Sequence, residues 1–194
     1  EMARQLERLG VDVIEAGFPV ASPEDFESVE KIAHEVQGCQ IAGLCRAVRG
    51  DIDCAWEALK DHPNPLIHIF LATSDIHLEA KLHKTREEVL AQVKEMVAYA
   101  KSMCPNIEFS AEDASRSDRD YLVQVFDAAQ QAGASVLNIP DTVGYATPAE
   151  MEELVRYVKA HLKHPDQAVL SVHCHNDLGM GVANSLAGMQ GGAD

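Results

Sequence analysis

Two histidines one residue apart, His173 and His175, stand at the end of an apolar run that begins at Val169. The aliphatic and β-branched residues of this run indicate a strand, in which residues i and i+2 point to the same face. The two imidazoles should therefore project side by side, with Cys174 turned the other way. Two nitrogen donors on one face are half of a metal site. The spacing alone leaves open the alternative that two polar residues simply close a strand.

Upstream, the chain repeats a short apolar strand, a polar turn and an amphipathic helix. Several helix starts carry capping signals, such as Ser22-Pro23 and the capping boxes from Thr85 to Glu88 and from Thr147 to Glu150. The stretch between Ser74 and Lys84 is expected to be a loop. Each repeat has about 30 residues, as βαβ units do. Strands are expected near residues 11–16, 40–45, 66–72, 107–112, 135–140 and 168–174.

This alternation predicts an α/β fold in which helices cover a parallel sheet. A closed TIM (β/α)₈ barrel typically has about 250 residues. We therefore expect an incomplete barrel of about six strands, with the first and last strands missing. An open doubly wound sheet is the structural alternative. Both ends of the sequence look cut and nothing divides it, so we expect residues 1–194 to be the central part of one catalytic domain without a second domain.

Composition excludes several classes of partner. The net charge is −15, so no basic surface for nucleic acid or an anionic membrane is expected. No apolar run is long enough to span a bilayer. The five cysteines are odd in number and lack C-x-x-C spacing, which favours a reducing compartment, the cytoplasm. An anionic substrate would need local positive charge from a metal or a few placed cations.

Polar residues gather where the expected strands end, and in a barrel these ends converge on one mouth. The candidates are Glu15, Arg46, His68, Ser110, Glu112, Asp141, Thr142, His173 and His175. Structural roles compete with chemistry: an internal ion pair for Glu15, and caps or salt bridges for Asp141 and Arg116. The remaining helix and loop histidines, His34, His62, His83, His161 and His164, are interpreted as solvated. A glycosidase built on Glu15 and Glu112 would give the two late histidines no role.

The stretch from Leu170 to Ala183 resembles the second signature of the α-isopropylmalate and homocitrate synthases, which are DRE-TIM metallolyases. Four further stretches resemble the isopropylmalate synthase branch: residues 10–19, 72–82, 109–114 and 138–145. Ala111 departs from the pattern, because the family usually has proline there. The resemblance covers nearly the whole chain, with several motifs in the right order.

The resemblance implies a Claisen-type acyl transfer from acetyl coenzyme A, the co-substrate, to a 2-oxo acid in a divalent-metal-dependent enzyme. In the isopropylmalate branch the acceptor is 2-oxoisovalerate, and the reaction commits carbon to leucine. The metal would be manganese or magnesium, with zinc as a further candidate, and the parent enzyme a homodimer. By resemblance, His173 and His175 match two metal ligands and Glu112 a catalytic glutamate. His68, Ser110 and Thr142 match residues that line the 2-oxo acid.

The family's metal-binding aspartate and asparagine have no match between Glu1 and Asp194, so we expect the isolated segment to be inactive. Citramalate or homocitrate synthases and a lyase-like metallolyase related to HMG-CoA lyase are alternatives within the resemblance. A metallohydrolase with an H-x-H pair is a rival from another class, but that pair usually lies on the first strand. A catalytically silent scaffold is the non-enzyme rival.

Overall fold

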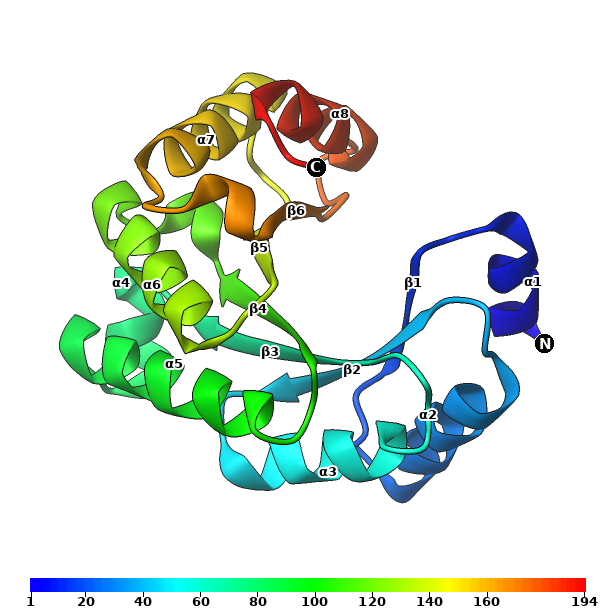
Figure 1. Ribbon diagram of the computed structural model, residues 1–194. Helices are drawn as coiled ribbons and strands as arrows, with labels where there is room; N and C mark the ends of the chain where they lie inside the picture. Colours follow the sequence, from blue (N-terminus) through cyan, green and yellow to red (C-terminus); the bar gives the residue numbers. More distant parts are fainter. The chain divides into compact units, whose positions relative to one another are not determined.

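The computed structural model describes residues 1–194. Its six strands form one sheet in the order β1-β2-β3-β4-β5-β6, so each strand lies beside the next one in the sequence (Figure 1). The strands are β1 (Val13–Gly17), β2 (Gln40–Arg46), β3 (Pro65–Ala72), β4 (Asn106–Glu112), β5 (Val136–Asp141) and β6 (Val169–Cys174). Parallel pairing joins β1 to β2, β2 to β3 and β5 to β6.

Helices connect the strands. They are α1 (Met2–Leu9), α2 (Pro23–Glu35), α3 (Arg49–Leu59), α4 (Asp75–His77), α5 (Arg86–Lys101), α6 (Arg119–Ala132), α7 (Pro148–His161) and α8 (Gly181–Gly191). Three short elements complete the chain: the π-helix η1 (Leu78–Leu82) and the 3₁₀ helices η2 (Ala114–Arg116) and η3 (Pro165–Gln167).

The sequential strand order confirms the prediction of an incomplete (β/α)₈ barrel. A doubly wound sheet reverses its strand order at a switch point, and no reversal occurs here. The observed strands also lie close to the expected bounds. The structural alternative of an open doubly wound sheet is therefore wrong.

The chain divides into two compact units. The first comprises Glu1–Phe70 and Met96–Glu108. Within it, α2 packs on β1 and on α3, and α3 packs on β2. Fully buried aliphatic side chains such as those of Ile41, Leu59 and Ile67 form its core, and their removal from water is the main favourable contribution to its stability.

The second unit comprises Leu71–Glu95 and Phe109–Asp194. In this unit α6 packs on β5 and α7, while α8 packs on α7 and β6. The contacts of α8 depend on glycine, because a Cβ at Gly188 would lie 2.9 Å from Cγ1 of Val172. A Cβ at Gly191 would lie 2.5 Å from the carbonyl oxygen of Glu152. Small residues thus set the approach of α8 to the strand that carries His173.

The expected capping signals form as predicted. Ser22 Oγ accepts the backbone N–H of Asp25 at 3.1 Å at the start of α2. The capping box of Thr147 and Glu150 opens α7, with the Thr147 N–H donating to Glu150 Oε2 at 2.8 Å. Gly133 ends α6 with φ 117°, in the left-handed region that favours glycine. Local sequence signals therefore fix these helix ends.

The stretch from Ser74 to Lys84, expected to be a loop, is helical over most of its length: α4 and the π-helix η1. Leu78 holds this stretch in place. It is only 3% exposed, and its backbone N–H donates to the carbonyl of Ser74 at 2.9 Å. The stretch thus combines one buried leucine with helical turns, whose backbone bonds satisfy groups that a loop would leave to water.

The prediction that His62 is solvated is also wrong. This side chain is 3% exposed. Its Nε2 lies 3.0 Å from the carbonyl oxygen of Val36, and its Nδ1 accepts the N–H of Asn64 at 3.0 Å. Both ring nitrogens are satisfied by backbone groups, so a neutral imidazole can be buried there without an unpaired polar atom.

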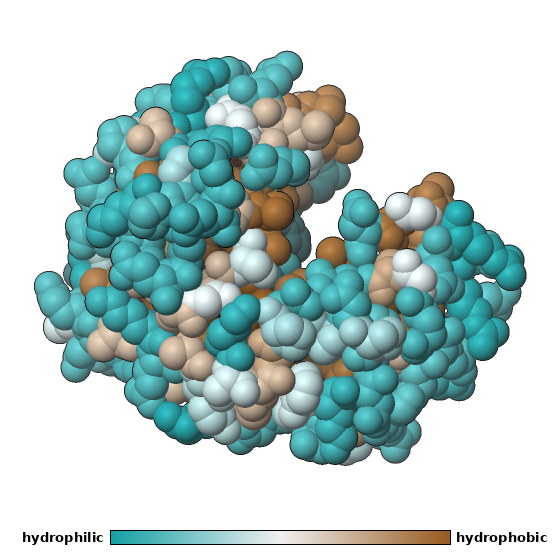
Figure 2. Space-filling model, viewed as in Figure 1, coloured by the Kyte–Doolittle hydropathy of each residue, from teal (hydrophilic) through white to brown (hydrophobic).

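One helix of the second unit leaves apolar side chains in solvent. Val182, Leu186 and Met189 lie on α8 and are exposed, and Figure 2 shows hydrophobic residues gathered at the surface over this helix. Their spacing of four and three residues places them on one face of the helix. None of the helices combines the length and the hydropathy that crossing a bilayer requires.

Candidate active site

The two histidines behave as their spacing predicts. The rings of His173 and His175 are stacked, with centroids 4.9 Å apart and an interplanar angle of 14°. Both side chains are exposed, whereas Cys174 between them is half-buried. Burial raises the pKa of the Cys174 thiol. The expectation that the two imidazoles project side by side is confirmed.

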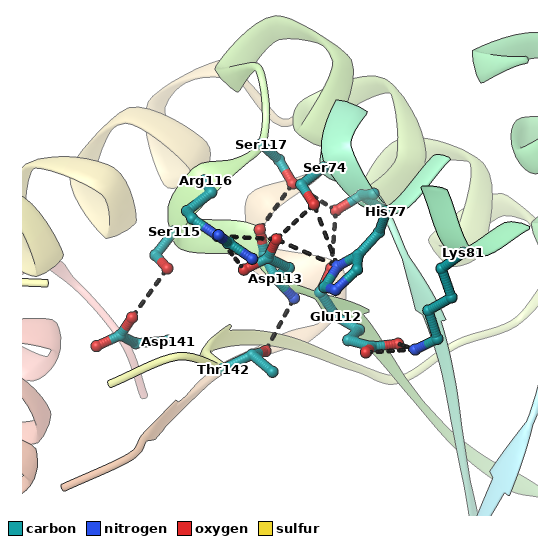
Figure 3. Close-up of polar contacts among 11 residues, drawn as sticks. Ser74, His77, Lys81, Glu112, Asp113, Ser115, Arg116, Ser117, Asp141 and Thr142 are labelled. Atoms are coloured by element: carbon teal, nitrogen blue, oxygen red, sulfur yellow. Dashed lines mark hydrogen bonds and ion pairs between the residues drawn. The ribbon is translucent and has the colours of Figure 1, made fainter. Parts of the chain in front are cut away.

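Glu112 closes β4 and meets a lysine from another element. Lys81, on η1, places its Nζ 2.6 Å from Oε1 and 2.8 Å from Oε2 of Glu112. The ammonium therefore engages both carboxylate oxygens (Figure 3). The Glu112 side chain is 17% exposed and the Lys81 side chain 47%. Sequence reasoning assigned no role to Lys81.

Beside Glu112, the carboxylate of Asp113 is fully buried and gathers three partners (Figure 3). Arg116 Nε donates to its two oxygens at 2.8 and 3.0 Å. His77 Nδ1 lies 3.2 Å from Oδ2, and the Ser74 hydroxyl donates to the same oxygen. The ion pair with Asp113 raises the pKa of Arg116 further above neutrality. This cluster ties the segment after β3 to the end of β4.

Thr142 follows β5 and is linked to the same cluster. Its Oγ accepts the backbone N–H of Asp113 at 2.9 Å. Because the hydroxyl oxygen is used as an acceptor there, its proton remains to be donated. The neighbouring Asp141 accepts the Ser115 hydroxyl at 2.9 Å and the Ala146 N–H at 3.1 Å. These contacts are structural, but they are neither the cap nor the salt bridge expected for Asp141.

Ser110 lies two residues before Glu112 and is 5% exposed. It accepts a hydrogen bond at 2.6 Å from Nδ2 of Asn138 on the neighbouring strand β5. The Asn138 side chain is itself 3% exposed, and its Oδ1 has no partner. A polar asparagine within an otherwise apolar strand is the signal that could have drawn attention to Asn138.

The first unit holds a separate ionisable cluster around His68. The Nδ1–H of His68 donates to Glu15, and its Nε2 lies 3.6 Å from Oε1 of Glu108. Burial lowers the pKa of His68, but the Glu15 hydrogen bond and the charges of Glu108 and Glu15 outweigh it, so the pKa is raised. Burial raises the pKa of Glu108. The internal ion pair proposed for Glu15 is confirmed.

The second unit thus brings several predicted residues to neighbouring strand ends. Glu112 ends β4, Thr142 follows β5, and His173 and His175 lie at and just beyond the end of β6. Parallel strands of a (β/α) fold present their carboxyl ends on one side, where such enzymes keep their sites. His68 belongs to the first unit, and its place beside these residues stays a prediction. Arg46 binds Asp51 through Nε at 2.6 Å, a structural pairing.

Taken together, the sequential α/β order and the polar strand ends define a protein of the (β/α) barrel class. The HMGL-like family model matches residues 1–194, and the chain belongs to that family. The chain is 58% identical over 193 residues to the 2-isopropylmalate synthase of Clostridium kluyveri and 57% identical over 194 residues to that of Dictyoglomus turgidum. It is fully covered in both matches but spans only 38% and 39% of these curated relatives.

Among solved structures, the fold resembles a hydroxymethylglutaryl-CoA lyase from Pseudomonas aeruginosa. The TM-score is 0.77 at 19% sequence identity, with 98% of this chain and 66% of that chain covered. At this identity the likeness concerns the fold alone. The resemblance seen in the sequence motifs is confirmed by the high identity to the synthases.

Proposed function

We propose that the protein containing this chain is an acyltransferase that condenses acetyl coenzyme A with 2-oxoisovalerate to give 2-isopropylmalate. The observation that carries the proposal is the gathering of Glu112, Thr142, His173 and His175 at the carboxyl ends of three neighbouring strands. Identity of more than half the residues to 2-isopropylmalate synthases across the chain supports it. This reaction is the first committed step of leucine biosynthesis. We place the protein in the cytoplasm, as a homodimer.

The reaction must balance as follows. The acetyl methyl group loses a proton, and its electron pair forms a carbon–carbon bond to the ketone carbon of 2-oxoisovalerate. The ketone oxygen takes up a proton and becomes a hydroxyl. Water then cleaves the thioester C–S bond, which releases a carboxylate, the coenzyme A thiol and a proton. The protein must supply at least two groups: a carboxylate that accepts a proton, and a hydrogen-bond donor to the carboxylate of the substrate.

His173 and His175 could supply two of the ligands of a divalent metal. Their stacked, exposed rings offer two nitrogen donors on one face. Such an ion, manganese or magnesium with zinc as a further candidate, would polarise the ketone as a Lewis acid. No group of three or more His, Cys, Asp or Glu side chains is placed to hold an ion. Two imidazoles leave a hard cation under-coordinated, so further oxygen ligands must complete the site.

Thr142 and Glu112 have complementary tasks in this proposal. The Thr142 hydroxyl accepts from the Asp113 N–H, which directs its own proton toward another acceptor. In this proposal, the acceptor of the Thr142 proton is the carboxylate of the 2-oxo acid. Glu112 is the catalytic carboxylate and takes a proton or a hydrogen bond beside the reacting ketone. Ser110, oriented by Asn138, and His68 line the 2-oxo acid.

The test is thiol release from acetyl coenzyme A by the whole protein with added manganese or magnesium. Pyruvate and 2-oxoglutarate are compared with 2-oxoisovalerate, because citramalate and homocitrate synthases would prefer these acceptors. His173→Ala should abolish turnover, whereas His34→Ala, which changes an exposed histidine of α2, should not. Equal turnover by both variants would contradict the metal role. No turnover with any 2-oxo acid would contradict the proposed function.

A further inference from the structure

We propose that Lys81 is a positioning residue for Glu112, an inference that rests on the proposed condensation. The contact that carries it is the approach of one ammonium to both oxygens of the carboxylate, at 2.6 and 2.8 Å. The two residues are 31 positions apart in the sequence. The pairing therefore joins the segment after β3 to the end of β4.

The backbone around Lys81 is fixed independently of Glu112. Lys81 lies on the π-helix η1, whose first residue, Leu78, is buried. The turn closes where the Lys84 N–H donates to the carbonyl of Leu78 at 3.1 Å and where His83 adopts φ 53°. Single π-turns are frequent at functional sites, and a non-glycine residue with positive φ requires its surroundings to hold it. The ammonium is thus carried by a locally constrained segment.

Stability does not explain this ion pair. The Lys81 side chain is 47% exposed, and ion pairs with an exposed partner contribute little to the free energy of unfolding. Direction is what the contact supplies. A glutamate side chain at a strand end has three rotatable bonds, and an ammonium that binds both oxygens restricts their rotation. The remaining lone pairs then keep one orientation toward a substrate, which is the geometric requirement of efficient catalysis.

The charge of Lys81 has a second effect. The protein carries a net charge of −15, and the proposed substrates are anions. An unbalanced Glu112 carboxylate would repel the carboxylate of a 2-oxo acid placed beside it. The neighbouring cation Arg116 is already bound to the buried Asp113. Lys81 therefore neutralises Glu112 locally and allows an anion to approach without removing the carboxylate as an acceptor.

The experiment measures steady-state kinetics of the whole protein with acetyl coenzyme A and 2-oxoisovalerate. Lys81→Met should lower kcat by about 10- to 100-fold, the loss expected from misplacing a catalytic group, with the KM for acetyl coenzyme A nearly unchanged. Lys81→Arg should recover most of the rate, because a guanidinium also binds a carboxylate through two donors. Lys84→Met is the matched control, because this lysine ends the same segment but donates to Gln92 instead.

A double-mutant cycle separates positioning from direct action. If Lys81 acts through Glu112, then Lys81→Met should cause no further loss in a Glu112→Gln background. Multiplying losses would overturn the inference. So would a KM for 2-oxoisovalerate that Lys81→Met still raises in the Glu112→Gln background, because this indicates direct substrate binding. A Lys81→Met rate equal to that of Lys84→Met would also overturn it while leaving the proposed function intact. A wild-type protein without condensation activity would overturn the proposed function and this inference together.

Discussion

Replacing Asp113 by asparagine is expected to destabilise the protein strongly, although the two side chains have nearly the same shape. Asp113 is fully buried and adopts φ 66°. Asparagine tolerates this left-handed conformation about as well as aspartate does, so the substitution adds no backbone strain. It removes the negative charge from the cluster of Ser74, His77 and Arg116 and replaces one acceptor oxygen by an amide donor.

The magnitude follows from the contacts of the carboxylate. Breaking a fully buried ion pair by removing one partner costs about 3–5 kcal/mol. Arg116 is 28% exposed and can turn partly to water, which reduces this cost to about 2–3 kcal/mol. Asp113→Ala should cost about 1 kcal/mol more than Asp113→Asn, because alanine is disfavoured at positive φ.

The assay is urea denaturation followed by circular dichroism, with Asp75→Asn as the control. Asp75 lies in the same segment and also binds an arginine, Arg86, at 2.8 Å, but its side chain is 60% exposed. The control should therefore cost less than about 1 kcal/mol. If Asp113→Asn costs no more than Asp75→Asn, the argument from burial is wrong.

Two further predictions concern stability in other parts of the chain. The pKa of His68 is raised, so its protonated ring stabilises the fold fully below about pH 6.5, and this stabilisation is lost as the pH rises through the folded-state pKa. Glu15→Gln should therefore lower the free energy of unfolding more at about pH 6 than at about pH 9 in parallel urea titrations. An equal cost at both pH values would contradict the pairing. Gly188→Ala should destabilise by about 1–3 kcal/mol in thermal unfolding, because its Cβ would meet Val172 at 2.9 Å, whereas Gly50→Ala, with open space around its Cβ, should not.

Features with local signals could be predicted from the sequence. The capping box at Thr147 is formed by residues close to one another in the sequence, and the structure has it where expected. The same-face placement of His173 and His175 follows from the two-residue period of a strand. These features depend on short-range geometry, which the sequence determines directly.

Features that depend on distant burial could not be predicted. Lys81 reaches Glu112 from a π-helix whose first residue, Leu78, is buried, and no local pattern shows that this leucine is buried. Asp113 collects its partners only once the segment after β3 has folded against the end of β4. Glu108, by contrast, could have been predicted to share a strand face with Ser110 and Glu112, because the three residues are spaced two apart.

The sequential order of the sheet bears on how the chain folds during its synthesis. Each strand lies beside the strand made just before it, so no pairing waits for a partner far ahead in the sequence. Loop-closure entropy is then small at every step, because each new strand pairs across one helical connection and no other strand lies between. A ribosome that delivers residues one at a time supplies the strands in the order in which the sheet accepts them. The growing edge of the sheet is the same surface that the next βα unit covers, which limits how long any one edge stays open to aggregation.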